Sequence, residues 1–93
     1  MTRIHKHEVH CDGNPRSFAI PAFARIVHVA AGFESARTVA FWVEFDERHK
    51  ADKVDRTFRV FGTGHEIPTG FRHVGTAVDY GLRLVWHLCE EVE

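Results

Sequence analysis

Several histidines and a glutamate in the second half of the chain have side chains suited to proton transfer. His65 and Glu66 are adjacent in a glycine-rich segment, His73 follows shortly after it, and His87 lies near the C-terminus. A histidine that takes a proton from a hydroxyl is a common general base, and threonines lie close by in the sequence. The spacing does not, however, identify a nucleophile, a base and an orienting group together. The sequence therefore favours a non-catalytic protein, with an enzyme as the alternative.

The adjacent histidine and glutamate belong to residues 61–70, which read FGTGHEIPTG. Apolar-alternating stretches flank this segment, so we expect a long loop between two strands, a kind of connection that often carries function. Glycine gives the backbone freedom to take positive φ or to approach a ligand closely, and successive N–H groups can cradle a small anion. The same residues also suit an ordinary turn, with Pro68 at its second position. Two interpretations stay open, a structural turn and a ligand site that consists of Gly62, Thr63, Gly64, His65 and Glu66.

The composition restricts the class of protein. A length of 93 residues indicates one domain, residues 1–93, and 44% hydrophobic with 27% charged residues is typical of a folded globular chain. Twelve basic and 13 acidic residues give a net charge of −1, which argues against a dedicated nucleic-acid-binding protein. No apolar run reaches the ~20 residues of a membrane helix, and the N-terminus lacks a signal-peptide core. We therefore expect a cytoplasmic protein that binds neither nucleic acid nor membrane.

Residues with metal-ligand chemistry are present, but without metal-ligand spacing. His5 and His7 would face the same way on a strand, as solvent-facing imidazoles or as a pair of ligands. Further ligands would have to come from other segments, and no Cys-x-x-Cys or His-Glu-x-x-His spacing is present. Cys11 and Cys89 are expected to be reduced thiols, with a bridge between them as the alternative. The sequence predicts no metal and no cofactor.

Alternation of apolar and polar residues runs through most of the chain, and helical periodicity is absent from its apolar segments. The strongest predicted strand is residues 38–45, and its alternate side chains predict the core: Val39, Phe41, Val43 and Phe45. Residues 24–31 predict a mostly buried strand, and Gly75 predicts a bulge or a close neighbour within residues 71–78. The polar residues 46–53 are expected to form an exposed loop.

The end of the chain predicts one more strand, residues 82–88. Its alternate side chains would line one face: Leu82, Leu84, Trp86 and Leu88. Three acids in the last four residues indicate a solvated tail, and residues 32–37 indicate a turn.

These segments add up to six or seven short strands in an all-β, single-domain protein. An antiparallel sheet of this size must fold over itself, either as a β-sandwich or as a partly open barrel. Such folds leave edges that a second copy can cover, so a homodimer is one possibility. Trp42 points away from the predicted core, and we expect either a second small core or an anchor for a partner protein.

The order of short motifs resembles a family of short, functionally uncharacterised proteins from tailed-phage genomes. The most specific parts of the resemblance are a Gly-Thr-Gly-His loop, residues 62–65, and a closing Trp86-His87 pair. The resemblance covers nearly the whole chain through four further segments: Ile4-His5-Lys6, Ile26-Val27-His28-Val29, Phe41-Trp42-Val43 and His73-Val74-Gly75-Thr76. It implies a phage-encoded protein that acts in a bacterial cytoplasm, and it supplies no catalytic residues.

The leading hypothesis is a small accessory protein that binds a host protein, for example a defence component, without catalysis. The alternative is a binder of a small anionic ligand or nucleotide signal that uses the 62–70 loop. A virion or assembly component is the third hypothesis. The candidate binding residues for the first two are Gly62, Thr63, Gly64, His65, Glu66, Trp42, His73 and His87.

Overall fold

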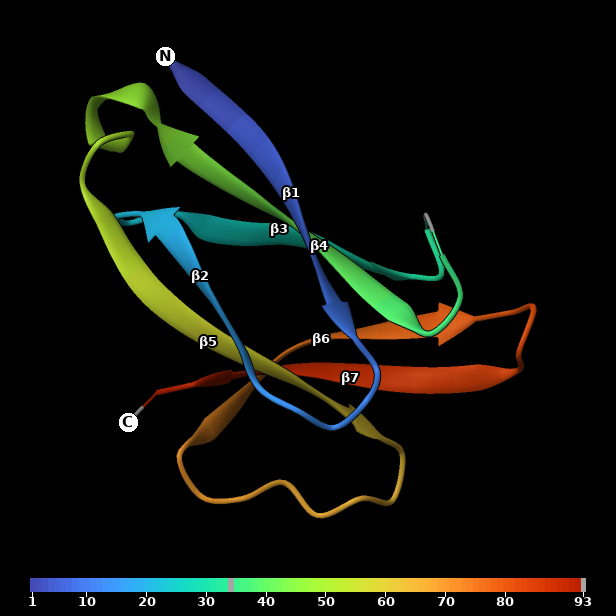
Figure 1. Ribbon diagram of the computed structural model, residues 1–93. Coiled ribbons are helices and arrows are strands. Elements are labelled where there is room, and N and C mark those ends of the chain that lie inside the picture. The colour runs from blue at the N-terminus through green and yellow to red at the C-terminus, as the bar shows by residue number, and fades with distance from the viewer. Residues whose placement is uncertain (34, 93) are drawn as a thin grey trace.

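The computed structural model describes residues 1–33 and 35–92, and these residues are almost entirely β-strands and turns (Figure 1). The strands are β1 (Thr2–His10), β2 (Arg16–Pro21), β3 (Arg25–Ala31), β4 (Thr38–Asp46), β5 (Lys53–Gly62), β6 (Phe71–Asp79) and β7 (Leu84–Glu91). The predicted all-β class is therefore confirmed. Glu34, in the predicted turn 32–37, and Glu93, in the predicted acidic tail, lie outside the described residues.

A short 3-10 helix, η1 (Glu47–His49), occupies the connection between β4 and β5. Its N-cap is Asp46, whose carboxylate accepts a hydrogen bond from the backbone N–H of Arg48 at 2.9 Å. The expected loop over residues 46–53 thus contains one capped turn. It is also less exposed than expected, because Glu47 and His49 are half-buried.

The strands form two antiparallel sheets, with the orders β1-β4-β3 and β2-β5-β7-β6. The two sheets pack face to face, and in the described part of the chain they do not close into a barrel (Figure 1). Of the two predicted architectures, the structure is the sandwich. Each sheet places alternate side chains inward, as the period of two requires.

The core lies between the sheets and is built on β4. Val39, Phe41 and Val43 are fully buried and Phe45 nearly so, as the sequence predicted. Phe58 of β5 meets Phe41 from the opposite sheet with ring centroids 4.5 Å apart. β4 is buried because it is the central strand of its sheet, with β1 on one side and β3 on the other. Truncating a phenylalanine at such a site costs about 3–5 kcal/mol.

β3 differs from its prediction. It was expected to be mostly buried, but none of its residues is fully buried and His28 is exposed. The reason is topological, because β3 pairs only with β4 and forms an edge of the three-stranded sheet. A register shift between Ile26 and His28 also turns the strand locally.

The structure confirms both predictions for Gly75 of β6, a bulge and a close neighbour. The β6–β7 register shifts between His73 and Gly75, which is a bulge. A Cβ at Gly75 would also lie 2.6 Å from Cγ2 of Val29, so β3 and β6 approach closely across the two sheets.

β7 starts and ends later than predicted. Leu82 lies in the turn before the strand, where its N–H donates to Oδ1 of Asp79 at 3.1 Å, and its side chain is exposed. Trp86 and Leu88 pack on the core as predicted. The prediction of a solvated acidic tail was wrong for Glu90, which is only 6% exposed and lies inside the strand.

Candidate functional site

The loop between β5 and β6 begins with a closed turn held by His65. The backbone N–H of His65 donates to the carbonyl of Gly62 at 3.2 Å, and Nδ1 of its ring accepts the N–H of Gly62 at 3.1 Å. A Cβ at Gly62 would lie 2.9 Å from the His65 ring, so this glycine permits the ring's close approach. Gly64 has a φ of 88°, and a Cβ added there would contact no other atom. Glycine is therefore needed at this position for its backbone conformation and not for space. The structural interpretation of the loop thus accounts for three of its residues.

Beside this turn, two histidines and two threonines form a continuous hydrogen-bonded chain. Oγ1 of Thr76 lies 2.9 Å from Nε2 of His73 and 3.0 Å from Nδ1 of His87. Nε2 of His87 lies 3.0 Å from Oγ1 of Thr63 at the start of the loop. His73 and His87 are not directly opposite, because the β6–β7 register pairs Thr76 with His87 and His73 with Cys89. Thr76 bridges the two rings, whose centroids are 5.7 Å apart.

The chemistry of this hydrogen-bonded chain of side chains depends on where its few protons lie. The Thr76 hydroxyl has one proton, so between neutral imidazoles it donates to one ring and accepts from the other. The chain therefore has two arrangements that run in opposite directions, and each fixes the tautomer of His87. Within residues 1–33 and 35–92, none of its four side chains bonds to a carboxylate that would orient a base. The arrangement suits hydrogen-bonded recognition better than activation of a nucleophile.

A shallow hollow of about 450 Å³ lies next to the chain. Gly62, Thr63 and His65 line its loop side, and residues 83–86 line its strand side. Trp86 is one of these residues, and its indole Nε1 is buried without a hydrogen-bond partner in the described part of the protein. A buried indole N–H normally has a partner, so Trp86 is an exception among the described residues, and its Nε1 is covered by the protein and not exposed to the hollow.

Trp42 lies elsewhere, on the outward face of the three-stranded sheet. Its ring is 5.5 Å from that of His28 and 5.4 Å from that of Phe33, in an edge-to-face contact with Phe33. Nζ of Lys6 lies 5.0 Å from the Phe33 centroid. Trp42 is half-buried by these neighbours, Phe33 is 60% exposed, and Ile4 on the adjacent strand is 54% exposed. We call Ile4, His28, Phe33 and Trp42 the aromatic patch.

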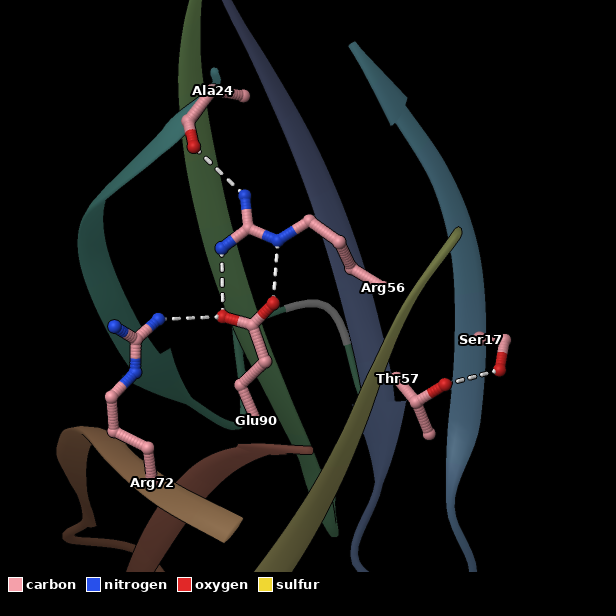
Figure 2. A network of polar contacts seen from close by, with 6 residues as sticks. All are labelled: Ser17, Ala24, Arg56, Thr57, Arg72 and Glu90. Atoms are coloured by element: carbon pink, nitrogen blue, oxygen red, sulfur yellow. Dashed lines mark hydrogen bonds and ion pairs between the residues drawn. The ribbon is translucent and has the colours of Figure 1, made fainter. Parts of the chain in front are cut away.

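A third group of polar residues was missed by the sequence analysis. Glu90 accepts two hydrogen bonds from Arg56, from Nε at 2.5 Å and Nη2 at 2.7 Å, and one from Nη2 of Arg72 at 3.1 Å (Figure 2). Nη1 of Arg56 donates to the carbonyl of Ala24 at 2.8 Å. The signal was present, because Arg56 and Glu90 both fall in the inward register of their strands, where an opposite charge is the expected partner.

The electrostatics of this group follow from its burial. Burial alone would raise the pKa of Glu90, but the hydrogen bonds and charges of Arg56 and Arg72 outweigh it and hold that pKa below its usual value. The hydrogen bond from Arg56 to Glu90 raises the pKa of the Arg56 guanidinium in turn. The pair is therefore ionised across the physiological range and acts as a fixed support between β5 and β7.

The remaining sequence candidates for metal and thiol chemistry lie apart from these sites. His5 is exposed, as expected for a solvent-facing imidazole, and its ring centroid lies 4.8 Å from that of Phe45, whereas His7 is half-buried and its ring centroid lies 5.0 Å from that of Phe18. Burial lowers the pKa of His7. Both cysteines are free thiols, and burial raises the pKa of Cys11 to about 11. Among the described residues, no group of three or more metal-ligating side chains occurs.

Comparison with known proteins gives a family. Residues 1–93 match the family described as Domain of unknown function (DUF7352). The chain belongs to this family. No curated protein and no solved structure matches the chain at a significant level. Within the residues that the structure describes, no helix is long and apolar enough to cross a membrane.

For this DUF7352 member the structure divides the predicted site residues among three places. Thr63, His73 and His87 meet in the hydrogen-bonded chain, while His65 turns back onto Gly62. Glu66 is exposed in the loop, and Trp42 is the centre of the aromatic patch on the other sheet.

Proposed function

We propose that this protein is a non-catalytic accessory protein, encoded by a phage, that binds a host protein in the bacterial cytoplasm through the aromatic patch. The observation that supports the proposal is the exposure of Phe33 and Ile4 around the half-buried ring of Trp42. The resemblance to short tailed-phage proteins supports the phage origin and the bacterial compartment.

The patch has the composition of an interface centre. Tryptophan is enriched among residues that dominate binding energy, and a rigid aromatic ring loses little conformational entropy when it binds. Trp42 and Phe33 hold each other edge to face, so the surface is organised before a partner arrives.

The shape of the patch favours a protein over a small molecule. No residue of the aromatic patch lines the hollow beside the loop, and none lines a second hollow formed by residues 24–26, Arg56 and residues 72–74. Small-molecule sites are concave, whereas protein interfaces are broad and flat. The occupant is therefore a partner protein that presents an exposed apolar side chain to Trp42.

The experiment compares capture of host proteins by the wild type, two patch variants and one control variant. Trp42→Ala and Phe33→Ser alter the patch, and Phe23→Ser removes an 88% exposed phenylalanine outside it as a matched control. A captured protein is then purified and its affinity measured directly. We expect Trp42→Ala to weaken binding by about 30-fold or more, as for an interface hot spot, while Phe23→Ser has little effect.

Two results would contradict the proposal. One is a purified partner that binds Trp42→Ala as tightly as the wild type. The other is a partner recovered equally by the patch variants and the control, which would place the interface elsewhere. Recovery only with phage particles would instead favour a virion component.

A second candidate function is supported by the hollow of about 450 Å³ beside the loop, which Thr63 and His65 line. In this proposal a small anionic ligand, such as a nucleotide signal, occupies the hollow and bonds to Thr63 and His65. Native mass spectrometry of protein from bacteria that make such signals tests it. We expect a retained small mass that Thr63→Val loses and the loop control Thr69→Val keeps. Absence of any retained mass, or equal retention by both variants, would count against this candidate.

A further inference from the structure

A separate hollow of about 310 Å³ lies where β3 and β6 meet at the edge of the sandwich. Its walls are residues 24–26 at the start of β3, residues 72–74 of β6, and Arg56 from β5. Three of the lining residues are arginines, Arg25, Arg56 and Arg72, although the whole chain has a net charge of −1. The concentration of guanidinium groups in one concave place indicates an anion site.

The base of this hollow is rigid. Arg56 uses Nε and both Nη atoms to hold Glu90 and the carbonyl of Ala24, so three of its five N–H groups bond within the protein (Figure 2). The side chains of Arg56 and Glu90 are only 18% and 8% exposed. The Arg56–Glu90 pair connects β5 and β7 to Ala24, the residue before β3, and it positions the side chains around the hollow.

Arg72 and Arg25 carry the exposed donors of the hollow. Arg72 gives one N–H to Glu90 and its side chain is 63% exposed, so most of its five N–H groups point to solvent or the hollow. Arg25 gives its Nε–H to Glu44 at 2.8 Å and its side chain is 74% exposed, which leaves its terminal nitrogens available. Glu90 and Glu44 thus orient the two arginines while consuming a minority of their donors.

We propose that this hollow binds the phosphate group of a small phosphorylated molecule, with Arg72 and Arg25 as the binding residues and Arg56 and Glu90 as positioning residues. A guanidinium presents parallel N–H donors that match two phosphate oxygens, and two guanidinium groups on neighbouring walls can contact different oxygens of one phosphate. The volume is at the small end of ligand sites, which favours a small ligand. The site is independent of the aromatic patch, so either proposal can fail without the other.

The test is an NMR titration of the whole protein at constant ionic strength. The probes are inorganic phosphate, a nucleoside monophosphate and acetate, and the signals followed are the backbone amides and arginine side chains. We expect the two phosphate probes to cause saturable shifts at residues 24–26 and 72–74. Arg72→Gln and Arg25→Gln each should weaken binding by about 10-fold or more, the effect of losing a charge-assisted hydrogen bond.

Arg48→Gln is the matched control, because Arg48 is an exposed arginine on η1 that does not line the hollow. Tighter binding of the nucleoside monophosphate than of inorganic phosphate supports a phosphorylated metabolite, and equal binding supports phosphate itself as the recognised group. The proposal is overturned by shifts that do not saturate, by equal weakening in Arg48→Gln, by unchanged affinity in Arg72→Gln, or by acetate binding as tightly as the phosphate probes.

Discussion

Replacing Gly75 with alanine tests how closely the two sheets approach. The new Cβ would lie 2.6 Å from Cγ2 and 3.2 Å from Cβ of Val29, and real Cβ atoms do not tolerate the shorter distance. The side chain or one of the two strands must therefore shift. Gly75 does not need its glycine for positive φ, so steric contact is the dominant cost of this substitution.

The magnitude follows from overpacking between packed elements, which typically costs 1–3 kcal/mol. Because Val29 lies on an edge strand and is half-buried, part of the clash can relax. We therefore expect Gly75→Ala to lower the free energy of unfolding by about 2 kcal/mol. In a domain of this size that lowers Tm by about 10 °C. Val29→Ala alone should cost about 1 kcal/mol through lost packing.

A double-mutant cycle measured by urea unfolding decides between steric and other causes. Val29→Ala removes both Cγ atoms and with them the 2.6 Å contact, so adding Gly75→Ala in that background should cost about 1 kcal/mol less than in the wild type. An equal cost of Gly75→Ala in both backgrounds would refute the reasoning, because the penalty would then not arise from Val29.

The other predictions concern the loop, the buried pair and pH. Gly64→Ala should lower the free energy of unfolding by about 1 kcal/mol, because alanine is strained at φ of 88°, and thermal unfolding checks this. Glu90→Ala should lower it by about 3 kcal/mol in urea unfolding, since Arg56 is left buried without its partner, and a cost no larger than that of Arg72→Ala would contradict this. Stability should also fall with acid in two steps. The pKa of His7 is lowered in the folded state, so the unfolded chain binds the proton more strongly and stability falls as pH drops below about 6.5, a step that His7→Phe should remove. The pKa of Glu90 is lowered too, so its contribution is present above the carboxyl pKa of the unfolded chain, about 4.3, and is lost as pH falls below it; a pH series of unfolding curves for Glu90→Gln checks this second step.

The local residue pattern was enough to predict the fold class and many of its strands, core side chains and turns. The alternation in residues 38–45 placed four core side chains correctly, because a side-chain period of two and one buried face leave a single register. Gly75 was recognised as a bulge or close neighbour for a similar local reason, since an isolated glycine in a strand has few other uses. The loop around Gly64 was also visible, because its residue types are those of turns.

Strand order could not be predicted, and the burial of individual strands depends on it. β3 has the β-branched composition of an inner strand, yet it lies at an edge, and only the pairing order shows this. Arg56 and Glu90 lie 34 positions apart, so their pairing required knowing that β5 and β7 are neighbours. The same holds for the bridge from His73 through Thr76 to His87, which a one-residue bulge created by shifting the register. The sequence determined which residues belong in strands and which belong in turns, because those preferences are local. Only the tertiary structure decided which polar side chains meet, because those contacts depend on long-range strand pairing and register.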